Sequence, residues 1–176
     1  MLTAEQQDSV RTCTRVMQII WAALLAGLGL FVALLLTVLA PTPLAEGRTP
    51  IVTYAALGAG VVAFVAGNVV TRIMATAQQH ALVTRAESPA GERDGADVAM
   101  LLGGYQVRFI VACALLEGAG YFNGAAYLIE GQWSSLAMIA ALAAGMLLLL
   151  PTPGRMRGWL ERKLATLQQE RQWTRP

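Results

Sequence analysis

The chain has 176 residues, of which 56% are hydrophobic and 14% are charged, and its formal net charge is +2. This composition is more apolar than that of a water-soluble domain of similar length, and it argues against a soluble fold. The basic residues lie in the gaps between apolar runs and not on one polar face, which argues against a nucleic-acid partner.

A helix start precedes the first apolar run. Thr3 and Gln6 have the spacing of a capping box, in which each side chain accepts a hydrogen bond from the other residue's backbone N–H. The first membrane span is expected over residues 16–40. It ends at Pro41 and Pro43, because proline removes a backbone donor and disfavours helical geometry in the residue before it. A cleaved signal peptide is the alternative, and the acidic residues of the leader argue against it.

Three more apolar runs have the length of a membrane span, which needs about 20 residues to cross about 30 Å of hydrocarbon. They cover about residues 51–71, 102–129 and 134–150. The charged segment 86–98 contains proline and glycine and is expected to be a cytoplasmic loop. A tight turn is expected between the third and fourth runs. Residues 1–153 are therefore predicted to form an all-α polytopic membrane domain, with four transmembrane helices as two antiparallel hairpins.

The C-terminal segment 154–176 is predicted to be a basic amphipathic helix. Its apolar residues recur at steps of three and four, and basic residues occupy other positions. We expect this tail to lie on the inner membrane surface, near anionic headgroups. The residues expected at that surface are Arg155, Arg157, Trp159, Arg162 and Lys163. The alternative is a solvated helix that packs on the cytoplasmic ends of its neighbours.

The distribution of Lys and Arg predicts the orientation. Of 13 such residues, two lie in the N-terminal leader, three in the 72–93 region and six in the C-terminal tail. Arg48 lies in an opposite-side loop and Arg108 lies within a span. Because basic loops tend to stay in the cytoplasm, both termini and the middle loop are expected there. The expected location is the plasma (inner) membrane of a bacterium.

Small residues predict where helices pack. Residues without bulk let two helix backbones approach closely. On the second span they recur at every fourth position, at Ala55, Ala59, Ala63 and Gly67. Gly120 and Gly124 give the third span a similar face. These faces predict a tight bundle and favour a homo-oligomer.

Glu117 is the residue most informative about function. It falls near the middle of the third span, where a charged side chain costs roughly a few kcal/mol and usually has a function. Tyr121, one helical turn later, shares its face. One interpretation is that the two residues bind a proton or cation. The alternative is that a protonated Glu117 is hydrogen-bonded to a neighbouring helix as a structural group.

Three other polar residues could support this site. Arg108 is nine residues before Glu117, so the two lie more than about 13 Å apart along one helix and cannot pair. We expect Arg108 to extend to the inner interface or to meet Asn68, which should have a similar depth on the second span. Asn123 is expected to bond across helices in preference to binding a ligand.

Residues 108–122 read Arg-Phe-Ile-Val-Ala-Cys-Ala-Leu-Leu-Glu-Gly-Ala-Gly-Tyr-Phe. This segment resembles the carboxylate-bearing helix of the proteolipid c subunits of rotary ATP synthases. The resemblance implies that Glu117 carries a proton or sodium ion, and double-hairpin members of that family have four spans. The rest of the chain departs from the family, since the glycine-rich first helix and the Arg-Gln-Pro loop are absent.

Enzymatic motifs are absent from the sequence. His80 is the only histidine, and no metal-ligand cluster, phosphate-binding glycine loop or catalytic set of Ser, His and Asp is apparent. We therefore expect no catalytic residue, metal or cofactor. The expected function is proton or cation binding and translocation through Glu117 in an oligomer. The alternative is a noncatalytic membrane scaffold or assembly protein.

Overall fold

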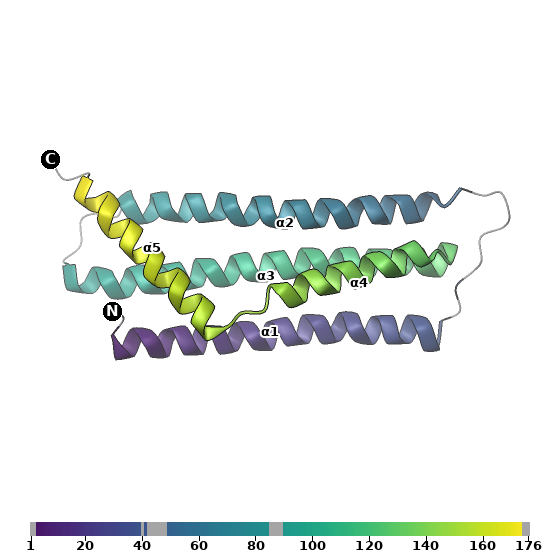
Figure 1. The fold of residues 1–176 in the computed structure, drawn as a ribbon, viewed down its shortest axis with the longest axis horizontal. Helices are drawn as coiled ribbons and strands as arrows, with labels where there is room; N and C mark the ends of the chain where they lie inside the picture. The colour runs from purple at the N-terminus through teal and green to yellow at the C-terminus, as the bar shows by residue number, and fades with distance from the viewer. Residues whose placement is uncertain (1–2, 40, 42–48, 85–89, 174–176) are drawn as a thin grey trace. The chain divides into compact units, whose positions relative to one another are not determined.

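The computed structural model describes residues 3–39, 41, 49–84 and 90–173. These residues contain five α-helices and no strand, which confirms the all-α class (Figure 1). The helices are α1 (Ala4–Thr37), α2 (Ile51–Thr84), α3 (Ala90–Glu130), α4 (Trp133–Leu148) and α5 (Pro153–Trp173). Arg48 and most of the loop after α1 lie outside the described residues.

The start of α1 agrees with the predicted capping box. The backbone N–H of Thr3 donates to Gln6 Oε1 at 3.0 Å, and the N–H of Gln6 donates to Thr3 Oγ1 at 3.3 Å. The first N–H groups of a helix have no partner within the helix. The two side chains therefore stabilise the first turn by satisfying donors there.

The start of α3 differs from the prediction. The helix begins at Ala90, so most of the expected loop 86–98 is helical, while residues 85–89 lie outside the described part. A glycine disfavours a helix by only about 1 kcal/mol. Val98 and Leu101 are 3% and 4% exposed, and burying each such side chain contributes about 1.5–3 kcal/mol. Packing of these turns therefore overrides the local preference for a loop.

The tight turn between α3 and α4 is confirmed. Gly131 has a φ of 65°, a left-handed conformation that glycine adopts without a clash at Cβ. Its N–H donates to the carbonyl oxygen of Tyr127 at 2.7 Å, which closes the end of α3. Gln132 then directly precedes α4.

In the described part of the chain, three helical segments are long and apolar enough to cross a membrane, namely Ala4–Thr37, Ile51–Gln78 and Gly95–Glu130. α4 has 16 residues and is about 24 Å long, which is less than the about 30 Å of hydrocarbon. α4 is long enough to be a candidate span only when it is taken together with α5 as far as Thr166. Counting this bent pair as one span gives four candidate spans. The chain thus has the helices of an integral membrane protein.

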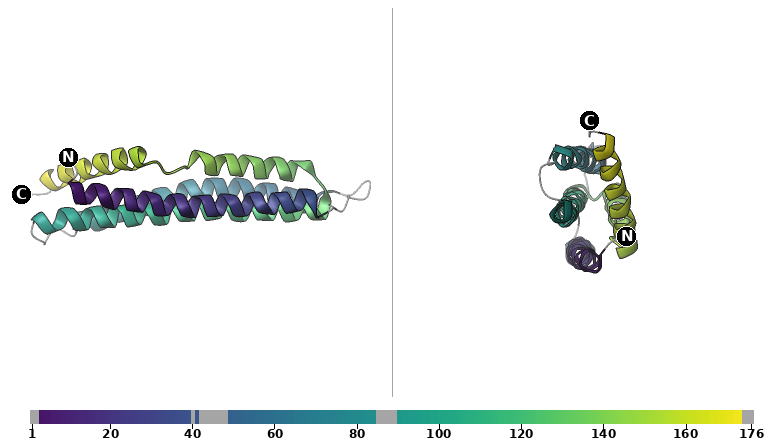
Figure 2. Two further views of the ribbon diagram at one scale, coloured as in Figure 1. Left: turned by 90° about the horizontal axis from the view of Figure 1, so that it is seen from below. Right: turned by 90° about the vertical axis from the view of Figure 1, so that its left-hand side faces the viewer.

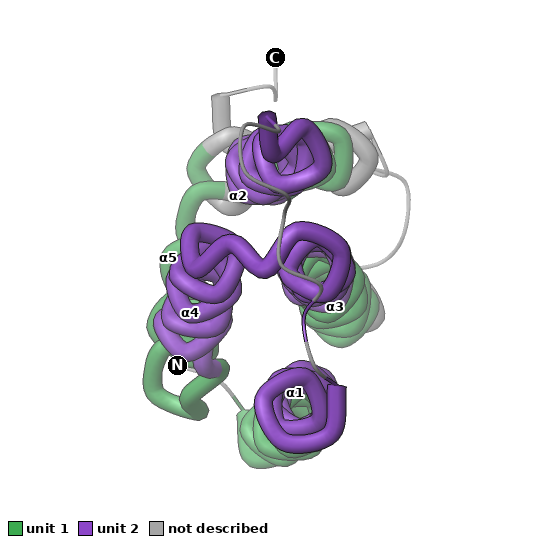
Figure 3. The backbone as a smooth tube through the Cα atoms, turned by 90° about the vertical axis from the view of Figure 1, so that its right-hand side faces the viewer, with its two compact units in different colours: residues 1–19, 70–109, 151–176 green, residues 20–69, 110–150 purple. Residues whose placement is uncertain are grey.

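The chain forms two compact units, and α1, α2 and α3 contribute residues to both (Figure 3). Unit 1 comprises residues 1–19, 70–109 and 151–176, and unit 2 comprises residues 20–69 and 110–150. Glu117, Tyr121 and Asn123 therefore belong to unit 2. Arg108 and the basic tail belong to unit 1.

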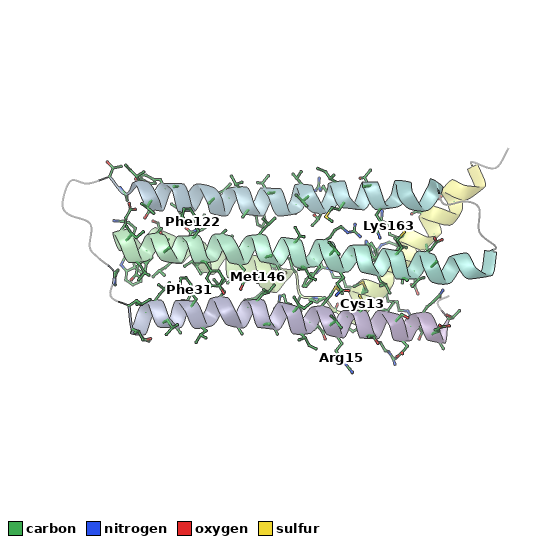
Figure 4. All side chains as sticks on the ribbon, turned by 180° about the vertical axis from the view of Figure 1, so that it is seen from behind. Cys13, Arg15, Phe31, Phe122, Met146 and Lys163 are labelled. Carbon is green, nitrogen blue, oxygen red and sulfur yellow. The ribbon has the colours of Figure 1, made fainter. Side chains whose placement is uncertain are left out.

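In unit 2, α3 lies between α1 and α2, and α4 packs along one side (Figure 3). Both predicted glycines of α3 face α1. A Cβ at Gly120 would lie 2.8 Å from Leu28 Cδ1, and a Cβ at Gly124 would overlap the Phe31 ring. Phe31 points from α1 towards α3 (Figure 4). Close contact between α1 and α3 thus depends on these two glycines.

The small-residue stripe of α2 does not form one buried face. Ala55 is exposed and Ala59 is half-buried, whereas Ala63 and Gly67 are buried. Because a helix turns about 100° per residue, each four-residue step drifts about 40° round the axis. The face that is buried follows alternating steps of three and four, which stay aligned. Its residues are Thr53, Ala56, Gly60, Ala63 and Gly67.

In unit 1, α5 lies on one side of α1, α2 and α3 and runs obliquely across them (Figure 2). Met156 and Leu160 of α5 are 2% and 0% exposed, and the Trp159 ring lies 4.8 Å from the Tyr105 ring of α3. Met156 and Leu160 are therefore buried in the protein, and Trp159 is half-buried beside Tyr105. A close-packed protein surface gives these side chains more dispersion contacts than a loose headgroup layer would.

Candidate functional site

The centre of the site is a pair of side chains on α3. The Tyr121 hydroxyl donates a hydrogen bond to Glu117 Oε1 at 2.9 Å. Their four-residue spacing places both side chains on one face of the helix. Both residues are half-buried. The structure therefore brings together the two residues that the sequence suggests for ion binding.

The backbone of α1 approaches this pair closely. A Cβ at Gly27 would lie 3.0 Å from the Tyr121 hydroxyl oxygen and 3.3 Å from Glu117 Oε1. One turn further along α1, the Phe31 ring meets the Tyr121 ring edge to face, with centroids 5.0 Å apart. Phe31 thus holds the tyrosine ring from one side, and the hydroxyl is directed at the carboxyl group.

Within the part of the chain that the structure describes, the one hydrogen bond to the Glu117 carboxyl comes from its own helix. The structural alternative required a bond to a neighbouring helix. An ionised carboxylate has about four acceptor positions, and Tyr121 occupies one of them. The group therefore has capacity to bind a proton, a water molecule or a cation.

Asn123 has the structural role that Glu117 lacks. Its side chain is 0% exposed, and Nδ2 donates to the carbonyl oxygens of Ala56 on α2 and Ala119 on α3, each at 2.9 Å. The expectation that Asn123 bonds across helices is confirmed. It connects α2 to α3 and makes no contact of this kind with Glu117.

Glu130 is a residue whose role the sequence did not reveal. It is 6% exposed, and its Oε1 and Oε2 accept hydrogen bonds from the backbone N–H groups of Val52 at 2.9 Å and Thr53 at 2.7 Å. The end of α3 thereby caps the start of α2, where unpaired donors and the helix dipole favour a carboxylate. One signal was available: Pro50 stands where a Ser, Thr, Asp or Asn cap is preferred.

Arg108 is enclosed in unit 1 and is 8% exposed. Its Nε donates to the carbonyl oxygen of Gly104 at 3.0 Å. Its guanidinium carbon lies 5.9 Å from the centroid of the Tyr105 ring and 5.5 Å from that of the Trp159 ring. Asn68 belongs to unit 2, is exposed, and donates to the carbonyl oxygen of Phe64 on its own helix at 2.8 Å.

The basic side chains of the tail differ from Trp159 in their placement. Arg155, Arg157 and Arg162 are exposed and Lys163 is half-buried. Arg157 Nε lies 3.2 Å from Glu161 Oε1, one helical turn later, in an exposed ion pair. The tail thus presents three exposed cations and packs its tryptophan against α3.

Among the residues that the structure describes, no group of His, Cys, Asp and Glu could hold a metal ion. In comparisons with known proteins, no family model, curated protein or solved structure matches the chain. The geometry of the Glu117–Tyr121 pair is therefore the main guide to function.

Proposed function

We propose that this protein is a small membrane carrier in which the Glu117–Tyr121 pair binds a proton or a monovalent cation and passes it across the bilayer within a homo-oligomer. The observation that carries the proposal is the hydrogen bonding of Glu117. This carboxyl group is half-buried in a candidate span and bonds its own helix, although a purely structural group should bond another helix.

The free-energy cost of placing a carboxylate in the membrane supports a functional role for Glu117. A carboxylate in the hydrocarbon region is unfavourable by roughly a few kcal/mol, so it is expected to serve a function. Asn123, six residues later, already connects α3 to α2 without carrying a charge. Glu117 is therefore not needed as the connection between these helices.

The chemistry of the pair fits reversible binding. A protonated carboxyl group is neutral and suits an apolar span. Its oxygen that carries no proton can still accept the hydrogen bond from the Tyr121 hydroxyl. When the proton leaves, the carboxylate oxygens and the phenolic oxygen can together coordinate a small cation. Gly27 keeps α1 close without covering the carboxyl with a side chain.

The resemblance of residues 108–122 to proteolipid c subunits gives Glu117 the same role of ion carrier. We also propose four spans arranged as two antiparallel hairpins, with both termini in the cytoplasm of a bacterium and the exposed tail cations near anionic headgroups. The asymmetry of Lys and Arg supports this orientation.

The proposal is tested by ion flux in proteoliposomes that contain the full chain. Glu117→Gln keeps the size of the side chain and removes its charge, so we expect flux to fall at least about 100-fold, the lower end of the range for loss of a proton-transfer group. Tyr121→Phe should lower flux less, because the carboxyl group remains. Glu161→Gln, which changes an exposed carboxylate on α5, should conduct like the native protein.

Folding and oligomeric state are measured for each variant by circular dichroism and light scattering in detergent. If folded Glu117→Gln conducts protons, Na⁺ and K⁺ as fast as the native protein does, the proposal is overturned. If the native protein conducts none of these ions and Glu117→Gln weakens its assembly, the protein is a scaffold.

A further inference from the structure

A buried cation in unit 1 has no anionic partner among the residues that the structure describes. Arg108 is 8% exposed, and its Nη2 is buried and has no hydrogen-bond partner among the residues that the structure describes. Within the described residues, the side chain makes one hydrogen bond, from Nε to the carbonyl oxygen of Gly104. Arginine has five N–H donors and stays charged in proteins, and the two donors on Nη2 have no acceptor among the described residues.

The neighbouring aromatic rings stabilise the positive charge of Arg108 but do not accept hydrogen bonds from its N–H groups in the plane of the guanidinium. Tyr105 and Trp159 lie 5.9 Å and 5.5 Å from the guanidinium carbon and attract its charge through their π faces. A ring face does not accept the pair of parallel N–H bonds that the guanidinium edge can donate. A buried charge is strongly unfavourable unless it is paired and its hydrogen bonds are satisfied. The site therefore lacks an anion.

We propose that Arg108, Tyr105 and Trp159 form a binding site for a phosphate group, supplied by an anionic phospholipid headgroup or by a soluble phosphate compound. The planar fork of the guanidinium matches two phosphate oxygens, as it does in other arginine sites for phosphate. The Tyr hydroxyl and the Trp N–H suit the interface, where one end of each ring is apolar and the other meets polar groups.

The depth and the local charge fit a headgroup. Arg108 is about 9 Å along the helix from residue 102, where the third apolar run begins, and its side chain runs back towards that end, since Nε donates to the carbonyl oxygen of Gly104. α5, which carries Trp159, also carries the exposed Arg162 in the same unit. Glu161 is paired with Arg157. The surface of α5 therefore attracts anions towards the site.

Native mass spectrometry of the full chain from a neutral detergent tests the site. The probes are phosphatidylglycerol, diacylglycerol as a lipid without phosphate, and inorganic phosphate. We expect phosphatidylglycerol to be retained and diacylglycerol not. Arg108→Gln should weaken phosphatidylglycerol binding about 10- to 100-fold, the loss expected for hydrogen bonds to a charged group. Arg15→Gln, which removes an exposed arginine of α1 in the same unit, should bind like the native protein.

The source of the phosphate is decided by competition. If excess inorganic phosphate displaces the lipid, the site accepts soluble phosphate, and if it does not, the site is one for a lipid headgroup. If Arg108→Gln does not fold, Arg108→Lys is used instead, because it keeps the positive charge but lacks the planar guanidinium group. We expect it to bind phosphatidylglycerol about tenfold more weakly than the native protein does. Native-like affinity in a folded Arg108 variant, or equal retention of diacylglycerol, would overturn the proposal.

Discussion

The two units accommodate charged side chains in different ways. In unit 2, both oxygens of Glu130 accept backbone N–H bonds from α2, and Glu117 accepts one hydroxyl bond from its own helix. In unit 1, Arg108 has one carbonyl and two ring faces, and Arg157 pairs with Glu161 at the surface. The comparison suggests that a charge with all its partners inside the chain is structural, and that one with unused capacity binds something else.

The largest effect is expected from a comparison of two glycine substitutions, one in unit 2 and one in unit 1. Gly124→Leu places a side chain where even a Cβ would overlap Phe31, so we expect a loss of about 1–3 kcal/mol in stability. Gly103→Leu, on the same helix in unit 1, meets open space and should change stability little. Unfolding in detergent, followed by circular dichroism, measures both. Equal losses would show that α1 and α3 do not pack closely at Gly124.

A smaller effect tests the polar connection between α2 and α3. Asn123→Leu removes the bond to the Ala56 carbonyl, and we expect a loss of about 0.6 kcal/mol, with about 1.7 kcal/mol as the upper end for bonds between membrane helices. Thr37→Val is the control, because Thr37 Oγ1 bonds only Ala33 of its own helix at an exposed position. The same unfolding experiment applies. A larger loss for Thr37→Val would contradict the role given to Asn123.

The smallest effect is expected at the surface of unit 1. Arg157→Gln breaks the exposed pair with Glu161, and we expect a change of about 0.3–0.5 kcal/mol that disappears at high salt. Unfolding at low and high ionic strength measures it. A salt-independent loss above about 1 kcal/mol would contradict the description of this contact as an exposed ion pair.

Local signals in the sequence predicted the features that depend on few neighbouring residues. The capping box at Thr3 and the glycine turn at Gly131 occur as predicted, because each is formed within one turn of chain. The pairing of Glu117 with Tyr121 belongs to the same class, since four-residue spacing fixes it. These features required no knowledge of how the helices pack.

Features that join distant segments did not follow from local signals in the sequence. Glu130 is 78 residues from Val52, and no periodic pattern links them. The stripe beginning at Ala55 was inferred from four-residue spacing, although a buried face needs alternating steps of three and four. The contact between the rings of Trp159 and Tyr105 also joins helices that are far apart in the chain.

The sequence by itself determined that the chain is helical and apolar enough for a membrane, where its first helix starts, and which carboxyl group stands alone in a span. Periodicity, proline and glycine positions and local hydrogen bonds are sufficient for these properties. Only the tertiary structure decided that Glu130 caps α2, that Asn123 joins two helices and that aromatic rings enclose Arg108. Each of these depends on which faces meet, and the energy that selects those faces comes from packing between residues far apart in the chain.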